Sequence, residues 1–137
     1  MSLMQGRCLC GAVQYELAAP FVSAAHCHCE SCRRANGAAF VSWGTVARLH
    51  FELRAGATSL NRFTSSPGAV RISCRICGSP LFMEYDGEPD WTYVTLASLI
   101  SAPQPPPDRH FSYEENVSWF SVSDSLPRVR GKTADLV

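Results

Sequence analysis

The sequence contains very little lysine and no excess of either charge. Lys132 is the one lysine among 12 basic residues, which 12 acidic residues balance to a net charge of zero. A nucleic-acid-binding surface usually shows as an excess of basic residues, so we expect no nucleic-acid partner. Hydrophobic residues make up 46% of the 137, which argues against a disordered chain and suits a single domain.

Long apolar runs are also missing. No stretch approaches the roughly 20 residues that a membrane helix needs, so we expect no membrane partner. No basic segment followed by an apolar one marks a signal peptide, and we expect a cytoplasmic protein. Residues 1–3 precede a second methionine, Met4, and are set aside as a candidate cloning remnant, which leaves one domain over residues 4–137. The sequence gives no indication of the oligomeric state.

Helical periodicity is scarce, and strand-like alternation prevails. Residues 30–36 alone resemble a helix, with Gly37 as its candidate C-cap. Short segments rich in β-branched and aromatic residues predict strands at residues 13–17, 40–43, 49–53, 70–72, 81–85, 91–96 and 117–122. We therefore expect a mainly β fold, with residues 102–107 as an extended proline-rich connection. The core is expected to include Trp43, Trp91 and Trp119.

Cysteine, by contrast, is abundant. The count of seven is odd, so complete internal pairing is impossible. A disulfide between Cys8 and Cys10 would be badly strained because one residue separates them. We therefore favour metal ligation over disulfides. Seven thiolates divide into four, which close a tetrahedral zinc site, and three, which leave a fourth position for water or substrate.

The spacing of the cysteines suggests how they divide. The two-ligand half-sites are Cys8 with Cys10 and Cys74 with Cys77. A glycine follows each pair and permits a tight turn that aims backbone N–H groups at sulfur. The remaining Cys27, Cys29 and Cys32 lie within six residues and can wrap one ion. We expect two zinc ions per chain: a structural one held by the four cysteines and a catalytic one held by the three.

The second site has two interpretations. His26 or His28 would close it as a fourth ligand, but each adjoins a ligand cysteine and is expected to point away from the metal. If the site stays open, zinc(II) with three thiolates forms a complex of net charge −1. This charge disfavours the formation of hydroxide from bound water and suits an incoming thiol as the fourth ligand. Metal binding would deprotonate that thiol and hold it as a nucleophile.

These motifs resemble the glutathione-dependent formaldehyde-activating enzymes, a family with an Mss4-like zinc-binding β fold. The resemblance rests on residues 6–15, 27–34 with Gly37, and 74–81, with residues 110–127 as a supporting tail. It implies antiparallel sheets built around zinc-binding knuckles, with the same structural and catalytic assignment of the cysteines. It also implies a carbon–sulfur lyase that joins formaldehyde and glutathione to S-hydroxymethylglutathione.

Several residues outside the cysteine clusters have two interpretations each. Arg33 and Arg34 follow the three-cysteine site and either hold the carboxylates of glutathione or form an exposed basic helix end. His110 is either a proton carrier or a packed side chain, and the second is more common. Glu30 has two interpretations as well: it is either a catalytic acid or base, or a solvated residue at the start of the helix. We favour the second.

Two other functions compete with the enzyme. The first is a non-catalytic module, in which both zinc ions shape a surface for a protein partner, and a fourth protein ligand at the second site would favour it. A methionine sulfoxide reductase requires a free catalytic cysteine, and the division into four and three leaves none.

Overall fold

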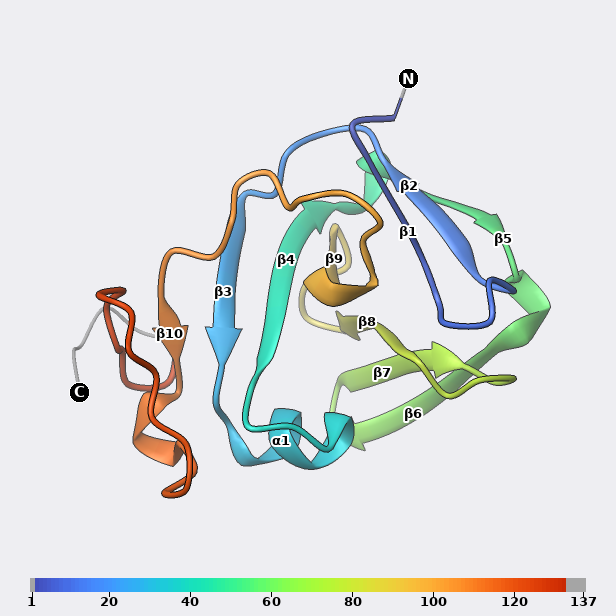
Figure 1. Ribbon diagram of the computed structural model, residues 1–137. Helices are drawn as coiled ribbons and strands as arrows, with labels where there is room; N and C mark the ends of the chain where they lie inside the picture. The colour runs from blue at the N-terminus through green and yellow to red at the C-terminus, as the bar shows by residue number, and fades with distance from the viewer. Residues whose placement is uncertain (1, 133–137) are drawn as a thin grey trace.

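The computed structural model describes residues 2–132, which form ten short strands and one α-helix joined by turns and loops (Figure 1). The first strands are β1 (Met4–Arg7), β2 (Gln14–Leu17), β3 (Ser23–Cys27), β4 (Val41–Ala47) and β5 (Phe51–Ala55). The others are β6 (Leu60–Ser66), β7 (Ala69–Cys74), β8 (Pro80–Tyr85), β9 (Trp91–Thr95) and β10 (His110–Phe111). The helix is α1 (Glu30–Asn36), and short 3-10 turns are η1 (Arg48–His50), η2 (Ala57–Ser59), η3 (Leu96–Ser98) and η4 (Tyr113–Glu115).

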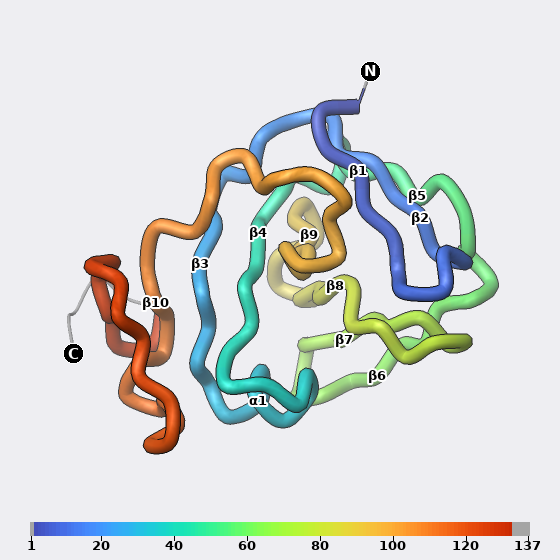
Figure 2. Tube along the Cα trace, viewed as in Figure 1, coloured from blue at the N-terminus to red at the C-terminus, as the bar shows by residue number. Residues whose placement is uncertain are grey.

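The strands form two sheets. The larger has seven strands in the order β10-β3-β4-β9-β8-β7-β6, and the smaller has the order β1-β2-β5. Neighbouring strands are antiparallel except for β10, which runs parallel to β3 at one edge. The helix α1 lies in the turn between β3 and β4, below the ends of both strands (Figure 2). In the described part of the chain, no helix has the length and apolarity to cross a membrane.

The helix forms at the predicted residues and is capped at both ends. At its start, Cys29 has extended backbone angles, and its sulfur accepts a hydrogen bond from the Cys32 N–H at 3.3 Å. At its end, Gly37 adopts the left-handed conformation, and its N–H donates to the Arg33 carbonyl. Such a residue ends many helices, because glycine meets no Cβ penalty there. The predicted helix and its C-cap are therefore confirmed.

The main core lies between the two sheets. Leu17 of β2, Val46 of β4 and Val94 of β9 are completely buried. Tyr15 packs edge-on against Phe82, with ring centroids 5.0 Å apart. Aromatic pairs in this geometry contribute about 1 kcal/mol beyond their buried area. The side chains that build this core alternate along each strand, so the intervening side chains point to the opposite face of the large sheet.

The opposite face of the large sheet carries a continuous row of side chains. Cross-strand register aligns Ser23 with Thr45, Thr45 with Tyr93, Tyr93 with Met83 and Met83 with Arg71. The row thus crosses β3 and β4 and the three later strands β9, β8 and β7, which come from two separate parts of the sequence. Residues of one row and one face lie side by side, so this face can assemble a site from five strands.

Most predicted strands are present, and one is wrong. Residues 117–122 contain no strand, and Trp119, expected in the core, is 73% exposed. The place beyond β10 is taken instead by a later segment, since His110 bridges to Arg128 and its N–H donates to the Pro127 carbonyl. The strand expected at residues 49–53 begins at Phe51, after η1. Trp43 is buried as expected, and Trp91 is half-buried.

The substitution Gly6→Ala is expected to destabilise the protein, because a Cβ at Gly6 would overlap the Tyr15 ring. Tyr15 is buried and its hydroxyl is 2.5 Å from Ser98 Oγ, so the ring cannot move freely. We expect the free energy of unfolding to fall by about 1–3 kcal/mol in denaturant titrations. The control is Gly87→Ala, where the added Cβ meets nothing within 4 Å. Equal stability of the two variants would contradict this packing.

Candidate metal centres and the adjoining cavity

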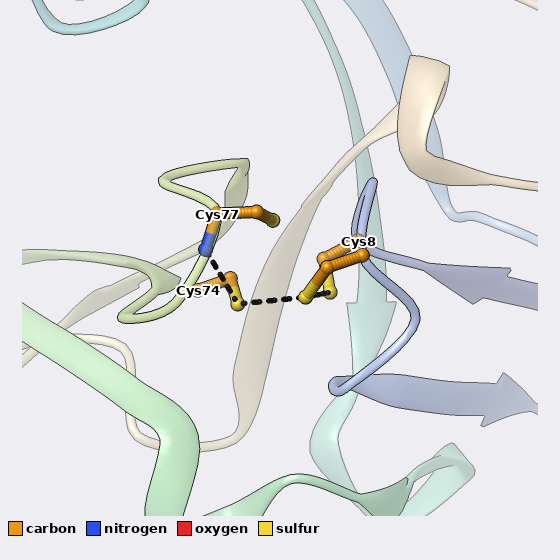
Figure 3. Close-up of side chains that lie close together, drawn as sticks. Cys8, Cys74 and Cys77 are labelled. Carbon is orange, nitrogen blue, oxygen red and sulfur yellow. Dashed lines mark hydrogen bonds between the residues drawn. The ribbon is translucent and has the colours of Figure 1, made fainter.

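Four cysteines from two distant turns converge. Cys8 and Cys10 lie in the turn after β1, while Cys74 ends β7 and Cys77 lies in the turn that follows it. Figure 3 shows Cys8, Cys74 and Cys77 directed toward a shared centre. All four sulfurs lie within 4.8 Å of one another. The half-site pairing that the sequence predicts is therefore present.

The tight turns that hold these sulfurs depend on glycine. Gly11 and Gly78 have φ values of 81° and 80°, a region that favours glycine because it has no Cβ. Backbone N–H groups of Val13 and Cys77 donate to the sulfurs of Cys8 and Cys74 at 3.3 and 3.5 Å. Such donors stabilise negative charge on sulfur, as the sequence analysis expected.

The geometry of these sulfurs fits zinc. Tetrahedral coordination with zinc–sulfur bonds of about 2.3 Å separates the sulfurs by about 3.8 Å. The Sγ atoms of Cys8 and Cys10 are 3.6 Å apart, and those of Cys10 and Cys74 are 3.8 Å apart. The hydroxyl of Ser79 lies 3.1 Å from the Cys77 sulfur, and this hydrogen bond lowers the pKa of Cys77 to about 5. A thiolate is the form that binds metal.

The other three cysteines lie where β3 passes into α1. Cys27 ends β3, Cys29 caps the helix, and Cys32 is buried on its first turn. Their sulfurs also lie within 4.8 Å of one another. Hydrogen bonds from the Cys27 and Cys29 thiols lower the pKa of Cys32 to about 2, whereas the pKa of Cys27 is raised.

Residues 2–132 provide no fourth histidine, cysteine, aspartate or glutamate ligand for this group. His28 Nε2 lies 2.8 Å from His110 Nδ1, and His26 Nδ1 lies 2.7 Å from Ser42 Oγ. Burial lowers the pKa of His28 to about 4, so its ring is neutral at pH 7. Both histidines are thus engaged away from the three sulfurs. The geometry favours the open form of the second site.

All three of these cysteines line a cavity of about 250 Å³. Its walls come from the side-chain row on the large sheet, with Trp43 and Tyr85 beside Tyr93 and Met83. Phe111 of β10 contributes a further aromatic wall. A concave, largely apolar pocket with a few polar groups is the usual form of a small-molecule site.

Among the described residues, two cations that were not expected from the sequence line this cavity. Arg71 Nη2 lies 3.7 Å from the Cys32 sulfur. Lys132 Nζ lies 3.2 Å from the Tyr85 hydroxyl and 5.0 Å from the centre of that ring. Lys132 is exposed overall, and partial desolvation of its ammonium group opposes its charge, but the Tyr85 hydroxyl and the cysteine sulfurs outweigh that effect and raise the pKa of Lys132. Neither residue belongs to a motif, so only the strand register and chain path could reveal them.

The buried Trp43 Nε1 has no hydrogen-bond partner among the described residues. Its N–H nevertheless helps to lower the pKa of Cys32, which places this donor near the three sulfurs. An orphaned donor beside three sulfurs is the kind of group that a bound ligand satisfies.

The predicted binding arginines lie outside this cavity. Arg33 Nε donates to the His28 carbonyl at 3.2 Å, and Arg34 forms an exposed ion pair with Glu30 at 2.8 Å. Arg34 lines a neighbouring depression that shares Trp43 and Arg71 with the cavity. Binding roles for Arg33 and Arg34 remain predictions.

Glu30 and His110 take the positions expected for structural residues. Glu30 is the exposed first residue of α1. His110 is completely buried, between His28 and Asp124, whose carboxylate lies 3.0 Å from its Nε2. Neither lines the cavity beside the three cysteines.

Comparison with known proteins identifies the family. Residues 3–115 match the profile described as glutathione-dependent formaldehyde-activating enzyme, and the chain belongs to this family. The mainly β architecture and its cysteine clusters agree with the Mss4-like fold. A Rhodobacter sphaeroides protein of known crystal structure superposes with a TM-score of 0.61 at 27% identity, over 75% of this chain and 98% of that chain.

A curated relative carries a lyase name. An uncharacterized lyase of Schizosaccharomyces pombe is 27% identical over 81 residues, which are 59% of this chain and 57% of the relative. The match thus spans less than two thirds of that relative's length. At the level of the family, these likenesses support glutathione-related lyase chemistry.

Elemental analysis and native mass spectrometry are expected to find about two zinc ions per chain, because four and three sulfurs form separate groups. The three-cysteine site is expected to lose its ion first during dialysis against a chelator, since it has fewer protein ligands. One zinc or fewer, with three or more thiols free to react, would contradict the two-site arrangement.

Substitution of Cys74 and of Cys29 is expected to have different effects on stability. Cys74→Ser removes a ligand that ties β7 to the turn after β1, and we expect a loss of about 4 kcal/mol or more in the free energy of unfolding. Cys29→Ser retains the helix cap, because serine is a favourable N-cap, and we expect a loss of about 1 kcal/mol. Denaturant titrations with zinc present test the contrast, and the reverse order would refute the assignment.

Proposed function

We propose that this protein is a zinc-dependent carbon–sulfur lyase that acts on a glutathione adduct of formaldehyde or of a related aldehyde. The observation that supports this most is the group of three sulfurs that line an apolar cavity and lack a fourth ligand in residues 2–132. Cys8, Cys10, Cys74 and Cys77 would hold a structural zinc, while Cys27, Cys29 and Cys32 would hold the catalytic one.

The proposed reaction forms one carbon–sulfur bond. Glutathione sulfur adds to the formaldehyde carbon, the carbonyl electron pair moves to oxygen, and the thiol proton ends on that oxygen. The product is S-hydroxymethylglutathione, and the reverse reaction is the lyase direction. Zinc in the three-cysteine site would supply a position at which the thiol loses its proton at neutral pH.

The residues of the cavity contribute orientation and charge. Arg71 offsets the negative charge of the three cysteines, since its guanidinium lies 3.7 Å from the Cys32 sulfur. Lys132 and Tyr85 place hydrogen-bond donors on the cavity wall, where the carbonyl oxygen gains negative charge as the bond forms. The rings of Trp43 and Phe111 exclude water, which limits competing hydration of the aldehyde.

The seven free cysteines suit a reducing compartment such as the cytoplasm, where glutathione is abundant. The alternative of a zinc-shaped protein-binding module would need a protein side chain in the fourth position, and the described residues near the three sulfurs offer none. The enzyme is therefore the function that we favour.

The test measures binding and turnover separately. We expect glutathione at millimolar concentration to shift NMR signals around Cys27, Cys29 and Cys32 and to leave those around Cys74 unchanged. Exchange spectroscopy with ¹³C-formaldehyde should show faster adduct exchange with the protein than without it. Cys29→Ser should lose this acceleration, whereas Arg62→Gln, at an exposed arginine outside the cavity, should keep it. Absence of glutathione binding would refute the proposal and favour the module.

A further inference from the structure

We infer that Arg71 and Lys132 bind a carboxylate of the ligand that reaches the three cysteines, so that this cavity selects carboxylate-bearing compounds. The inference rests on the proposed function, because it concerns the ligand of the same site. The carboxylate can belong to the thiol or to the carbonyl compound, and the two sources are separable by experiment.

The charges around the cavity favour an anion. Its lining residues within the described chain include Arg71 and Lys132 but no aspartate or glutamate. Three thiolates and one zinc(II) ion carry one negative charge, so the two cations leave a single net positive charge. A cavity with this charge and low-dielectric walls attracts anionic ligands.

Neither cation has a carboxylate partner in residues 2–132. Other arginines do pair with carboxylates: Arg34 with Glu30, Arg62 with Glu84 and Arg128 with Asp124. Arg71 instead donates from Nε to Ser65 Oγ at 3.2 Å, besides its contact with Cys32. These contacts use two of its five N–H groups, and the planar guanidinium retains donors suited to a carboxylate.

Lys132 is held in place without losing its capacity to bind. Its Nζ lies over the rings of Tyr85 and Tyr93, 5.0 and 5.5 Å from their centres. One of its three donors reaches the Tyr85 hydroxyl at 3.2 Å. Cation–π contacts orient the ammonium group and leave its other donors available to a ligand.

The size of the cavity indicates a ligand larger than a hydroxymethyl group. Formaldehyde has two heavy atoms and needs about 60 Å³, twice the volume share of a water molecule. The cavity measures about 250 Å³ and is lined mainly by rings and by Met83. It therefore has room for about eight heavy atoms, which suffice for the reacting carbon and sulfur with a short carboxylate-bearing chain, while the rest of a ligand as large as glutathione would extend beyond the cavity.

The test compares matched ligands on the zinc-loaded full chain by NMR titration. Mercaptoacetate and 2-mercaptoethanol form the thiol pair, of which one member has a carboxylate. Glyoxylate and acetaldehyde, added with saturating 2-mercaptoethanol, form the carbonyl pair. We expect the carboxylate member of at least one pair to bind about tenfold more tightly than its neutral counterpart. The pair that shows the preference identifies the source of the carboxylate.

Substitutions test whether Arg71 and Lys132 cause the preference for the carboxylate ligand. Arg71→Gln and Lys132→Gln should each reduce it several-fold, while Arg71→Lys should keep part of it because the charge remains. Arg62→Gln, the loss of an exposed arginine from neighbouring β6, should keep all of it.

Two results would overturn the inference and leave the proposed function standing. The first is equal binding of both members in each pair to the unsubstituted protein. The second is a preference for the carboxylate ligand that is lost in the Arg34→Gln variant and unchanged in the Arg71→Gln variant. Failure of every thiol to bind would refute the proposed function itself, and the inference would fall with it.

Discussion

The convergence of two turns that are far apart in the sequence is the constraint on which the site depends. The sulfurs of Cys10 and Cys74 meet across 64 residues, at a distance of 3.8 Å. Closing so long a loop costs conformational entropy, which metal binding linked to folding can offset. Cys74 ends β7, and Arg71 lies three residues earlier in the same strand. The four-cysteine site thus holds β7 in place, and β7 in turn positions Arg71 beside the three-cysteine site.

The two faces of the large sheet have different roles: one forms the main core and the other forms the cavity wall. One face packs Val46 and Val94 against the small sheet and forms the main core. The other face presents Tyr93, Met83 and Arg71 in one cross-strand row beside the cysteines of β3 and α1. Because strand side chains alternate, the same strands that stabilise the fold also form the cavity wall.

Local sequence signals were sufficient to predict the helix and to predict which cysteines group together. Gly37 marks the end of α1 through its own backbone preference, and each half-site needs only a few neighbouring residues. The cavity was not predictable in this way, because Arg71 faces the sulfurs through the register of distant strands and Lys132 through the path of the C-terminal segment. The strand expected at residues 117–122 failed for a related reason, since another segment takes the place beside β10.

The central claim is that three cysteines leave one zinc position open to a non-protein ligand. A crystal structure of the zinc-loaded protein with glutathione, with anomalous scattering measured at the zinc edge, tests it most directly. We predict two zinc peaks: one inside four cysteine sulfurs, and one bound by Cys27, Cys29 and Cys32 with glutathione sulfur or water in the fourth position. A protein side chain in that fourth position, or a single zinc peak at the four cysteines, would contradict the account.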